Sequence, residues 1–71
     1  MFNIRLRDLR EDNDLTQEEL SKKLNITRSA LANYETGIRE PSIELLIKIA
    51  DFFNVSLDYL LCRTNDNEPF K

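Results

Sequence analysis

The sequence predicts an all-α fold, a compact bundle of five helices. Its 71 residues contain only one glycine and two prolines, so few positions interrupt a helix. No segment shows sustained alternation of apolar and polar residues, which is the pattern of a half-buried strand. Apolar residues recur at helical spacing instead, and one helix-start pattern occurs three times. A chain of this length forms a single small domain with a modest core.

Apolar stripes mark the expected helices along the chain. The helices span residues 2–12, 16–24, 27–35, 42–53 and 56–62. In the first three helices the stripes are Phe2, Leu6 and Leu9, then Leu20 and Leu24, then Leu31 and Tyr34. Residues three or four positions apart lie on one side of a helix, so each stripe can face a common core.

The repeated helix-start pattern reads DLTQEEL, NITRSAL and NVSLDYL. Each begins with Asp or Asn, then an apolar residue, then Thr or Ser, and has a further apolar residue four positions later. Thr16, Thr27 and Ser56 therefore stand where an N-cap hydroxyl accepts otherwise unpaired backbone N–H groups. The apolar pairs have hydrophobic-staple spacing: Leu15 with Leu20, Ile26 with Leu31, and Val55 with Leu60.

Other residues support the same boundaries. Thr16 and Glu19 complete a capping box, and Ser42 is a fourth N-cap, directly after Pro41. The residues before the three staples belong to the types that tolerate a left-handed backbone: Asp14, Asn25 and Asn54.

Helices 16–24 and 27–35 are separated by a turn too short to be a flexible linker. Asn25 stops the first helix and Thr27 caps the second. Ser21 and Ala30 are small, which allows the two helices to approach closely. This is a helix-turn-helix arrangement, in which the second helix can project as a rigid unit into a DNA major groove.

Helix 42–53 has more apolar surface than a single stripe requires. Two apolar lines run along it: Leu46, Ala50 and Phe53, and Leu45, Ile49 and Phe52. Either the helix lies at the centre of the bundle and is buried on most sides, or part of it forms a dimer contact. The residues of that contact would be Leu45, Phe52, Leu57, Tyr59 and Leu61.

The composition excludes several kinds of site. The chain has no histidine and one cysteine, Cys62, so it cannot form an intramolecular disulfide or a histidine or multi-cysteine metal site. We expect no metal ion, no cofactor and no enzymatic activity, with the acidic residues on solvated helix surfaces. No apolar run has the length of a membrane span, and the charged start is unlike a secretory signal. We therefore expect a cytoplasmic protein.

The charge balance is acidic, with a net charge of −3. Residues 1–41 hold seven basic and eight acidic side chains, and residues 42–71 hold three and five, so the two parts carry −1 and −2. Nucleic-acid binders often have a basic excess, so we expect modest non-specific affinity for DNA.

The segment LTQEELSKKLNITRSALANYETGIREPSIELLIKIADFFNVSLDYLL resembles the DNA-binding domain of the Cro and phage-repressor family, the XRE-type regulators. The resemblance covers residues 4–62 and implies a lambda-repressor-like fold with the helix-turn-helix in helices two and three. Residues 1–62 would then form the DNA-binding domain and residues 63–71 a mobile tail. Asp14, Asn25 and Cys62 stand where the family usually has glycine, and Ser21 where it has alanine.

The resemblance assigns roles to individual residues. Gln17, Thr27 and the segment Gly37, Ile38 and Arg39 would contact DNA phosphates, Gln17 with help from its backbone N–H at a helix N-terminus. Arg10 and Glu35 would form an ion pair that links helix one to the end of helix three.

Arg28, Ser29 and Asn33 can share one face of helix three, which we expect to read bases. Arginine can bind guanine O6 and N7 together, and asparagine can pair with adenine in a bidentate manner. These features predict sequence-specific binding to double-stranded DNA. The resemblance implies in addition a bacterial or phage-encoded repressor that binds a palindromic site as a homodimer. The alternative is a protein-interaction module, which the acidic balance and the surplus apolar residues would suit.

Overall fold

The computed structural model describes residues 2–64, and this part of the chain folds into five α-helices without a β-strand. The helices are Phe2–Asp12 (α1), Gln17–Leu24 (α2), Arg28–Thr36 (α3), Ile43–Phe53 (α4) and Leu57–Leu60 (α5). The predicted all-α fold is confirmed. Residues 65–71, which include most of the predicted tail, lie outside the described residues.

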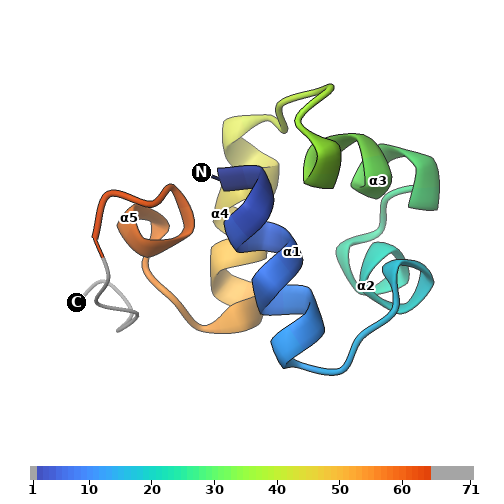
Figure 1. The fold of residues 1–71 in the computed structure, drawn as a ribbon, viewed down its shortest axis with the longest axis horizontal. Coiled ribbons are helices and arrows are strands. Elements are labelled where there is room, and N and C mark those ends of the chain that lie inside the picture. Colours follow the sequence, from blue (N-terminus) through green and yellow to red (C-terminus); the bar gives the residue numbers. More distant parts are fainter. Residues whose placement is uncertain (1, 65–71) are drawn as a thin grey trace.

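The helices surround one core. Figure 1 shows α2 and α3 at one end of the view and α5 at the other, with α1 and α4 between them. Helix α1 packs against α3 and α5, while α2 packs against α3 and α4. Within residues 2–64, no helix combines the length and the apolar character that a membrane span requires.

The predicted N-caps begin four of the helices. Thr16, Thr27, Ser42 and Ser56 each accept a hydrogen bond from the backbone N–H three residues later. Around α2 the capping box is complete, because the Glu19 carboxylate also accepts from the Thr16 N–H at 2.9 Å. The caps satisfy backbone donors that have no partner within a helix.

The turns use the left-handed backbone that the sequence predicts. Asp14, Asn25 and Asn54 have φ values of 57°, 59° and 55°. Cys62, which stands where the resemblance implies glycine, also has a left-handed backbone, with φ of 64°. The N–H of Arg63 then donates to the Asp58 carbonyl at 2.8 Å, and α5 ends at Leu60, two residues before the predicted end.

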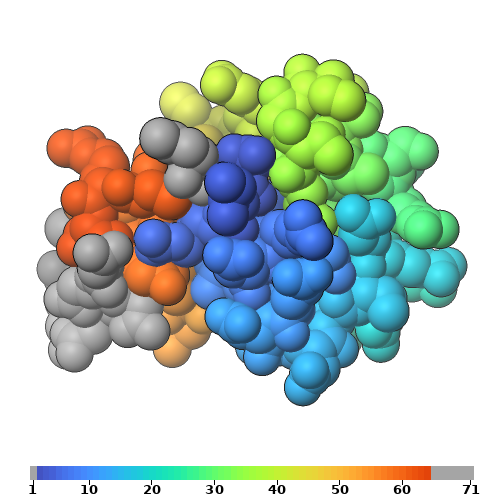
Figure 2. Space-filling view, viewed as in Figure 1, coloured from blue at the N-terminus to red at the C-terminus, as the bar shows by residue number. Residues whose placement is uncertain are grey.

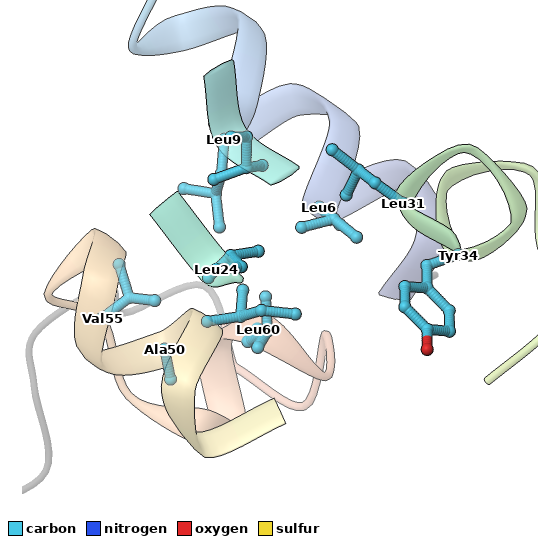
Figure 3. Close-up of a cluster of buried hydrophobic side chains, with 10 residues drawn as sticks. Leu6, Leu9, Leu24, Leu31, Tyr34, Ala50, Val55 and Leu60 are labelled. Atoms are coloured by element: carbon cyan, nitrogen blue, oxygen red, sulfur yellow. The ribbon is translucent and has the colours of Figure 1, made fainter. Parts of the chain in front are cut away.

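Ten side chains form the buried core, and all five helices contribute to it. Figure 3 shows Leu6, Leu24 and Leu60 pointing toward the same interior region from α1, α2 and α5. Six large side chains are almost completely buried: Leu6, Leu20, Leu24, Leu31, Ile49 and Leu60. Burying one such side chain stabilises a fold by about 1.5 to 3 kcal/mol relative to leaving it exposed, before cavity effects.

Helix α4 is central but keeps an exposed apolar side. Ile49 and Ala50 are buried, whereas Ile43, Ile47 and Phe52 remain 71%, 48% and 40% exposed. Both sequence interpretations therefore retain support, since one side of α4 packs into the core and another faces outward.

Two basic side chains connect distant helices. The Lys48 ammonium on α4 donates to the Leu24 carbonyl at the end of α2, at 2.7 Å. Arg5 of α1 donates to the Tyr59 carbonyl at 3.0 Å, and its guanidinium carbon lies 4.0 Å from the centre of the Tyr59 ring. These contacts attach α4 to the helix-turn-helix and α1 to α5.

Candidate nucleic-acid interface

The turn between α2 and α3 is closed by hydrogen bonds at both ends. The N–H of Ile26 donates to the Ser21 carbonyl at 2.9 Å, and the N–H of Asn25 to the Lys22 carbonyl at 3.1 Å. On the other side, Thr27 accepts from the Ala30 N–H at 3.0 Å. Ser21 is buried, so a small side chain lies where the helices approach each other. The orientation of α3 relative to α2 is therefore rigid.

The side chains expected to read bases lie on the outer part of α3. Arg28 and Ser29 are exposed in its first turn, and Asn33 is half-buried one turn later. Within residues 2–64, Arg28 has no ion-pair partner. Its guanidinium is thus available to an external acceptor.

Gln17, the first residue of α2, is attached to the end of α3. Its Nε2 donates to Oε1 of Glu35 at 3.2 Å. The same carboxylate accepts two hydrogen bonds from Arg10, from Nε to Oε2 at 2.7 Å and from Nη2 to Oε1 at 3.1 Å. The structure thus brings together the expected pair of Arg10 and Glu35, and adds Gln17 to it.

This carboxylate group is almost completely buried. The side chain of Glu35 is 3% exposed and that of Arg10 is 13% exposed. The hydrogen bond to Glu35 raises the pKa of Arg10, desolvation opposes this, and the charges of Glu35 and Glu11 add to it. Arg10 Nη1 also donates to the Leu15 carbonyl at 2.8 Å. One guanidinium therefore connects α1, the α1–α2 turn and α3.

The loop after α3 presents a different kind of surface. Gly37 ends the helix with φ of 83°, and the Arg39 N–H donates to the Asn33 carbonyl at 3.3 Å. Ile38 is 75% exposed, and Arg39 is exposed beside it. A Cβ on Gly37 would be 3.5 Å from Nδ2 of Asn3, an ordinary contact, so the left-handed φ is what favours glycine here.

A small polar hollow, which the sequence did not predict, lies beside the pair of Arg10 and Glu35. It measures about 230 Å³ and is lined by Arg7, Arg10, Glu11, Gln17, Glu35 and Thr36. In Figure 2, the blue atoms of α1 adjoin the cyan atoms of α2 and the green atoms of α3 on the displayed face. The i, i+4 spacing of Arg7 and Glu11 is typical of a helical ion pair, but spacing alone does not show that the pair adjoins α2 and α3.

The residues expected at a dimer contact belong to α4 and to the region of α5. Helix α5 lies at the end of the view opposite α2 and α3 (Figure 1). Leu57, Tyr59 and Leu61 are half-buried on or beside α5, and Phe52 is exposed. Leu45 packs against the core. A groove of about 540 Å³ between α4 and α5 has four apolar and four polar lining residues: Ile47, Ala50, Val55 and Leu57, and Asp51, Asn54, Ser56 and Asp58.

Metal ligands are not gathered in the described region. Within residues 2–64, no group of three or more Cys, Asp or Glu side chains is placed to hold a metal ion.

Comparison with known proteins gives a consistent result over nearly the whole domain. The sequence model of a family described as helix-turn-helix matches residues 6–60. The chain is 42% identical over 71 residues to the uncharacterized HTH-type transcriptional regulator YqaE of Bacillus subtilis, covering all of this chain and 61% of that protein.

Two further relatives have more specific names. The transcriptional repressor RstR of the cryptic phage CTXphi, from Vibrio cholerae, is 34% identical over 73 residues, with 100% of this chain and 66% of the relative covered. The HTH-type transcriptional activator BcrR of Enterococcus faecalis is 42% identical over 60 residues, covering 84% of this chain and 29% of the relative. The chain thus spans less than two thirds of the length of these relatives.

Proposed function

We propose that this chain, which belongs to the helix-turn-helix family, is a DNA-binding transcriptional regulator that represses transcription from a palindromic operator. In this proposal α3 enters the major groove, and two copies of the chain bind the two half-sites. Occupancy of the operator would compete with transcription initiation.

The observation that carries this proposal is the exposed start of α3 on a rigid turn. Arg28 and Ser29 project from its first turn, and Asn33 follows one turn later. Thr27 uses its hydroxyl to cap the helix and stands beside them. A bidentate contact from Arg28 or Asn33 to a base would contribute about 1 to 3 kcal/mol of discrimination.

Phosphate contacts would fix the position of α3 on the duplex. The Gln17 amide donates one hydrogen to Glu35, and its second hydrogen remains for a phosphate oxygen. Its backbone N–H lies at a helix N-terminus, which favours an anion. Thr27, the N–H groups of Gly37 and Ile38, and the Arg39 guanidinium would extend this row of contacts.

Dimerisation would use the surface around α4 and α5. Phe52 is 40% exposed, and Leu57, Tyr59 and Leu61 are half-buried, so all four can contribute apolar area. Leu45 contributes less because it already packs against the core. Ile43 and Ile47 are exposed next to this surface and were not part of the expected contact.

Self-association is measurable by sedimentation equilibrium. Phe52→Ser should weaken the dimer, whereas Ile4→Ser, a matched change at an apolar side chain 55% exposed on α1, should not. Equal association of both variants and the wild type would remove Phe52 from the interface.

The repressor assignment is supported by the similarity to RstR over the whole chain, although BcrR is named an activator. The bacterial and phage origin of YqaE and RstR also supports a cytoplasmic location. The direction of regulation can be measured with a reporter gene placed under the control of the operator that selection from a random DNA pool identifies. A repressor should lower the expression of this gene.

Selection of bound duplexes from a random-sequence pool, at physiological salt, tests the DNA-binding proposal. The wild type should enrich a two-fold symmetric motif, and Arg28→Ala/Asn33→Ala should not. Arg63→Ala is the matched control, because it removes a cation beside α5, where Arg63 Nε lies 3.9 Å from Asp58 Oδ1. Circular dichroism should show that all three proteins are folded.

The second candidate function is that of a protein-interaction module, and the same selection experiment tests it. If no motif is enriched and the wild type and double variant bind DNA weakly and equally, the protein is better described as an interaction module for another protein. The exposed apolar side chains Ile43, Ile47 and Phe52 favour that function.

A further inference from the structure

We infer that the carboxylate of Glu11 competes with a DNA phosphate for Arg7 and Arg10 in the hollow between α1, α2 and α3. Glu11 contacts Arg7 and lies beside Arg10, and so it weakens the binding of a phosphate there. This inference rests on the proposed DNA binding and assigns a regulating residue to it. Binding of a phosphate at this place requires the contact between Arg7 and Glu11 to open.

The position of Glu11 is the first support. Its Oε2 is 3.5 Å from Nε of Arg7 and 4.0 Å from Nη2 of Arg10. All three side chains line the 230 Å³ hollow, together with Gln17 of α2. The carboxylate thus presents its negative charge to both arginines, as a phosphate oxygen would.

The balance of charge in the hollow is the second support. Arg7 and Arg10 supply two positive charges, and Glu11 and Glu35 supply two negative charges. Glu35 cannot leave its place easily, because its side chain is 3% exposed and accepts two hydrogen bonds from Arg10. Displacement of Glu11 is therefore the change that gives the hollow a net positive charge.

Exposure makes that displacement easy. The side chains of Arg7 and Glu11 are 62% and 51% exposed, so water screens their attraction. An exposed pair of this kind contributes little to stability. Arg7 can therefore exchange Glu11 for a phosphate without disturbing the buried pair of Arg10 and Glu35.

Hydrogen-bond donors beside the arginines suit the same anion. Gln17 lines the hollow, and its amide donates only one of its two hydrogens to Glu35. A phosphate at this place would hold α2 against the DNA backbone. Phosphates are present at every DNA sequence, so Glu11 weakens this contact on any duplex and lowers the non-specific affinity.

Fluorescence anisotropy with a labelled duplex tests this inference. The duplex carries the motif from the selection experiment, and a mixed-sequence duplex serves for the non-specific measurement. Glu11→Gln should bind both duplexes about 2- to 5-fold more tightly than the wild type, the range expected for a screened surface charge. Asp8→Asn removes one negative charge from the same helix outside the lining of the hollow and should give a smaller change.

Arg7 provides the second half of the test. Arg7→Ala should weaken binding, and its dependence of log K on log salt should be shallower by about one unit, as for the loss of one phosphate contact. In Arg7→Ala/Glu11→Gln, the gain from Glu11→Gln should shrink, because the two residues act on the same anion. Thermal unfolding should show that all variants remain folded.

The outcomes separate this inference from the proposed function. If the wild type binds DNA and Glu11→Gln binds no more tightly, or if Asp8→Asn gives an equal gain, the role of Glu11 is refuted and DNA binding stands. If neither the wild type nor Glu11→Gln binds any duplex, the proposed function fails and this inference with it.

Discussion

The guanidinium of Arg10 and the carboxylate of Glu35 meet across 25 positions of sequence, with Nε of Arg10 2.7 Å from Oε2 of Glu35. The pair joins α1 to the end of α3, and Gln17 of α2 donates to the same carboxylate. Each charge is removed from water by the fold and compensated by the other. Loss of either partner therefore leaves an uncompensated charge in a poorly solvated place.

Glu35→Ala should lower the free energy of unfolding by about 3 kcal/mol, because it leaves Arg10 partly buried without its carboxylate. Urea unfolding followed by circular dichroism measures this change. Glu18→Ala is the control, since Glu18 is 67% exposed and its Oε1 lies 3.9 Å from Nζ of Lys22. That change should cost less than about 1 kcal/mol. Similar losses in both variants would contradict a special role for the buried pair.

Thr27→Ala should destabilise the protein by about 1 kcal/mol, because the N–H of Ala30 loses the hydroxyl that caps α3. The expected fall in Tm is about 4 to 8 °C for a domain of this size. Thr27→Ser keeps the hydroxyl and should remain close to the wild type. An equal fall in Tm for the serine variant would show that the methyl group, and not the cap, is responsible.

Cys62→Gly should raise the free energy of unfolding by up to about 1 kcal/mol, because Cys62 has φ of 64° and glycine adopts this region without steric cost. Cys62→Ala removes the thiol but keeps the strain, so it should not be stabilising. Chemical unfolding under reducing conditions compares the three proteins. Stabilisation by alanine as large as that by glycine would assign the effect to the thiol.

Acid should weaken the start of α2 through Glu19. The backbone N–H of Thr16 donates to this carboxylate and lowers its pKa in the folded state, with a smaller effect of the Thr16 hydroxyl. A lowered folded pKa means that the stabilisation is complete above the ordinary glutamate value of about 4.3 and is lost as pH falls through the folded value.

The comparison of the wild type with Glu19→Gln isolates this effect. Their difference in free energy of unfolding should be constant near neutral pH and should decrease as pH falls below about 4. Urea unfolding at a series of pH values measures it. A difference that does not change with pH would exclude the charged capping box as its source.

Local residue patterns were sufficient to find where the helices begin. Each cap is a local contact: the hydroxyl of Thr16, Thr27, Ser42 or Ser56 accepts from the backbone N–H three residues later. Donor and acceptor therefore lie within one short segment of sequence. The end of α5 was less predictable, because it depends on whether Cys62 adopts a left-handed backbone. A cysteine does not have the preference of glycine for that region.

The sequence alone was sufficient for the helical class, the N-caps, the tight turn before α3 and the apolar stripes of the first three helices. These features depend on spacings of a few residues, for which helical geometry supplies the distances. The packing of the helices was needed to show which side of α4 is buried. It was also needed to show that Gln17 shares Glu35 with Arg10, that Lys48 reaches the Leu24 carbonyl, and that the Arg7 and Glu11 pair adjoins α2 and α3. Those contacts depend on how the packed helices are oriented, because a donor and an acceptor 18 or 24 positions apart meet only when burial of the shared core brings their helices together.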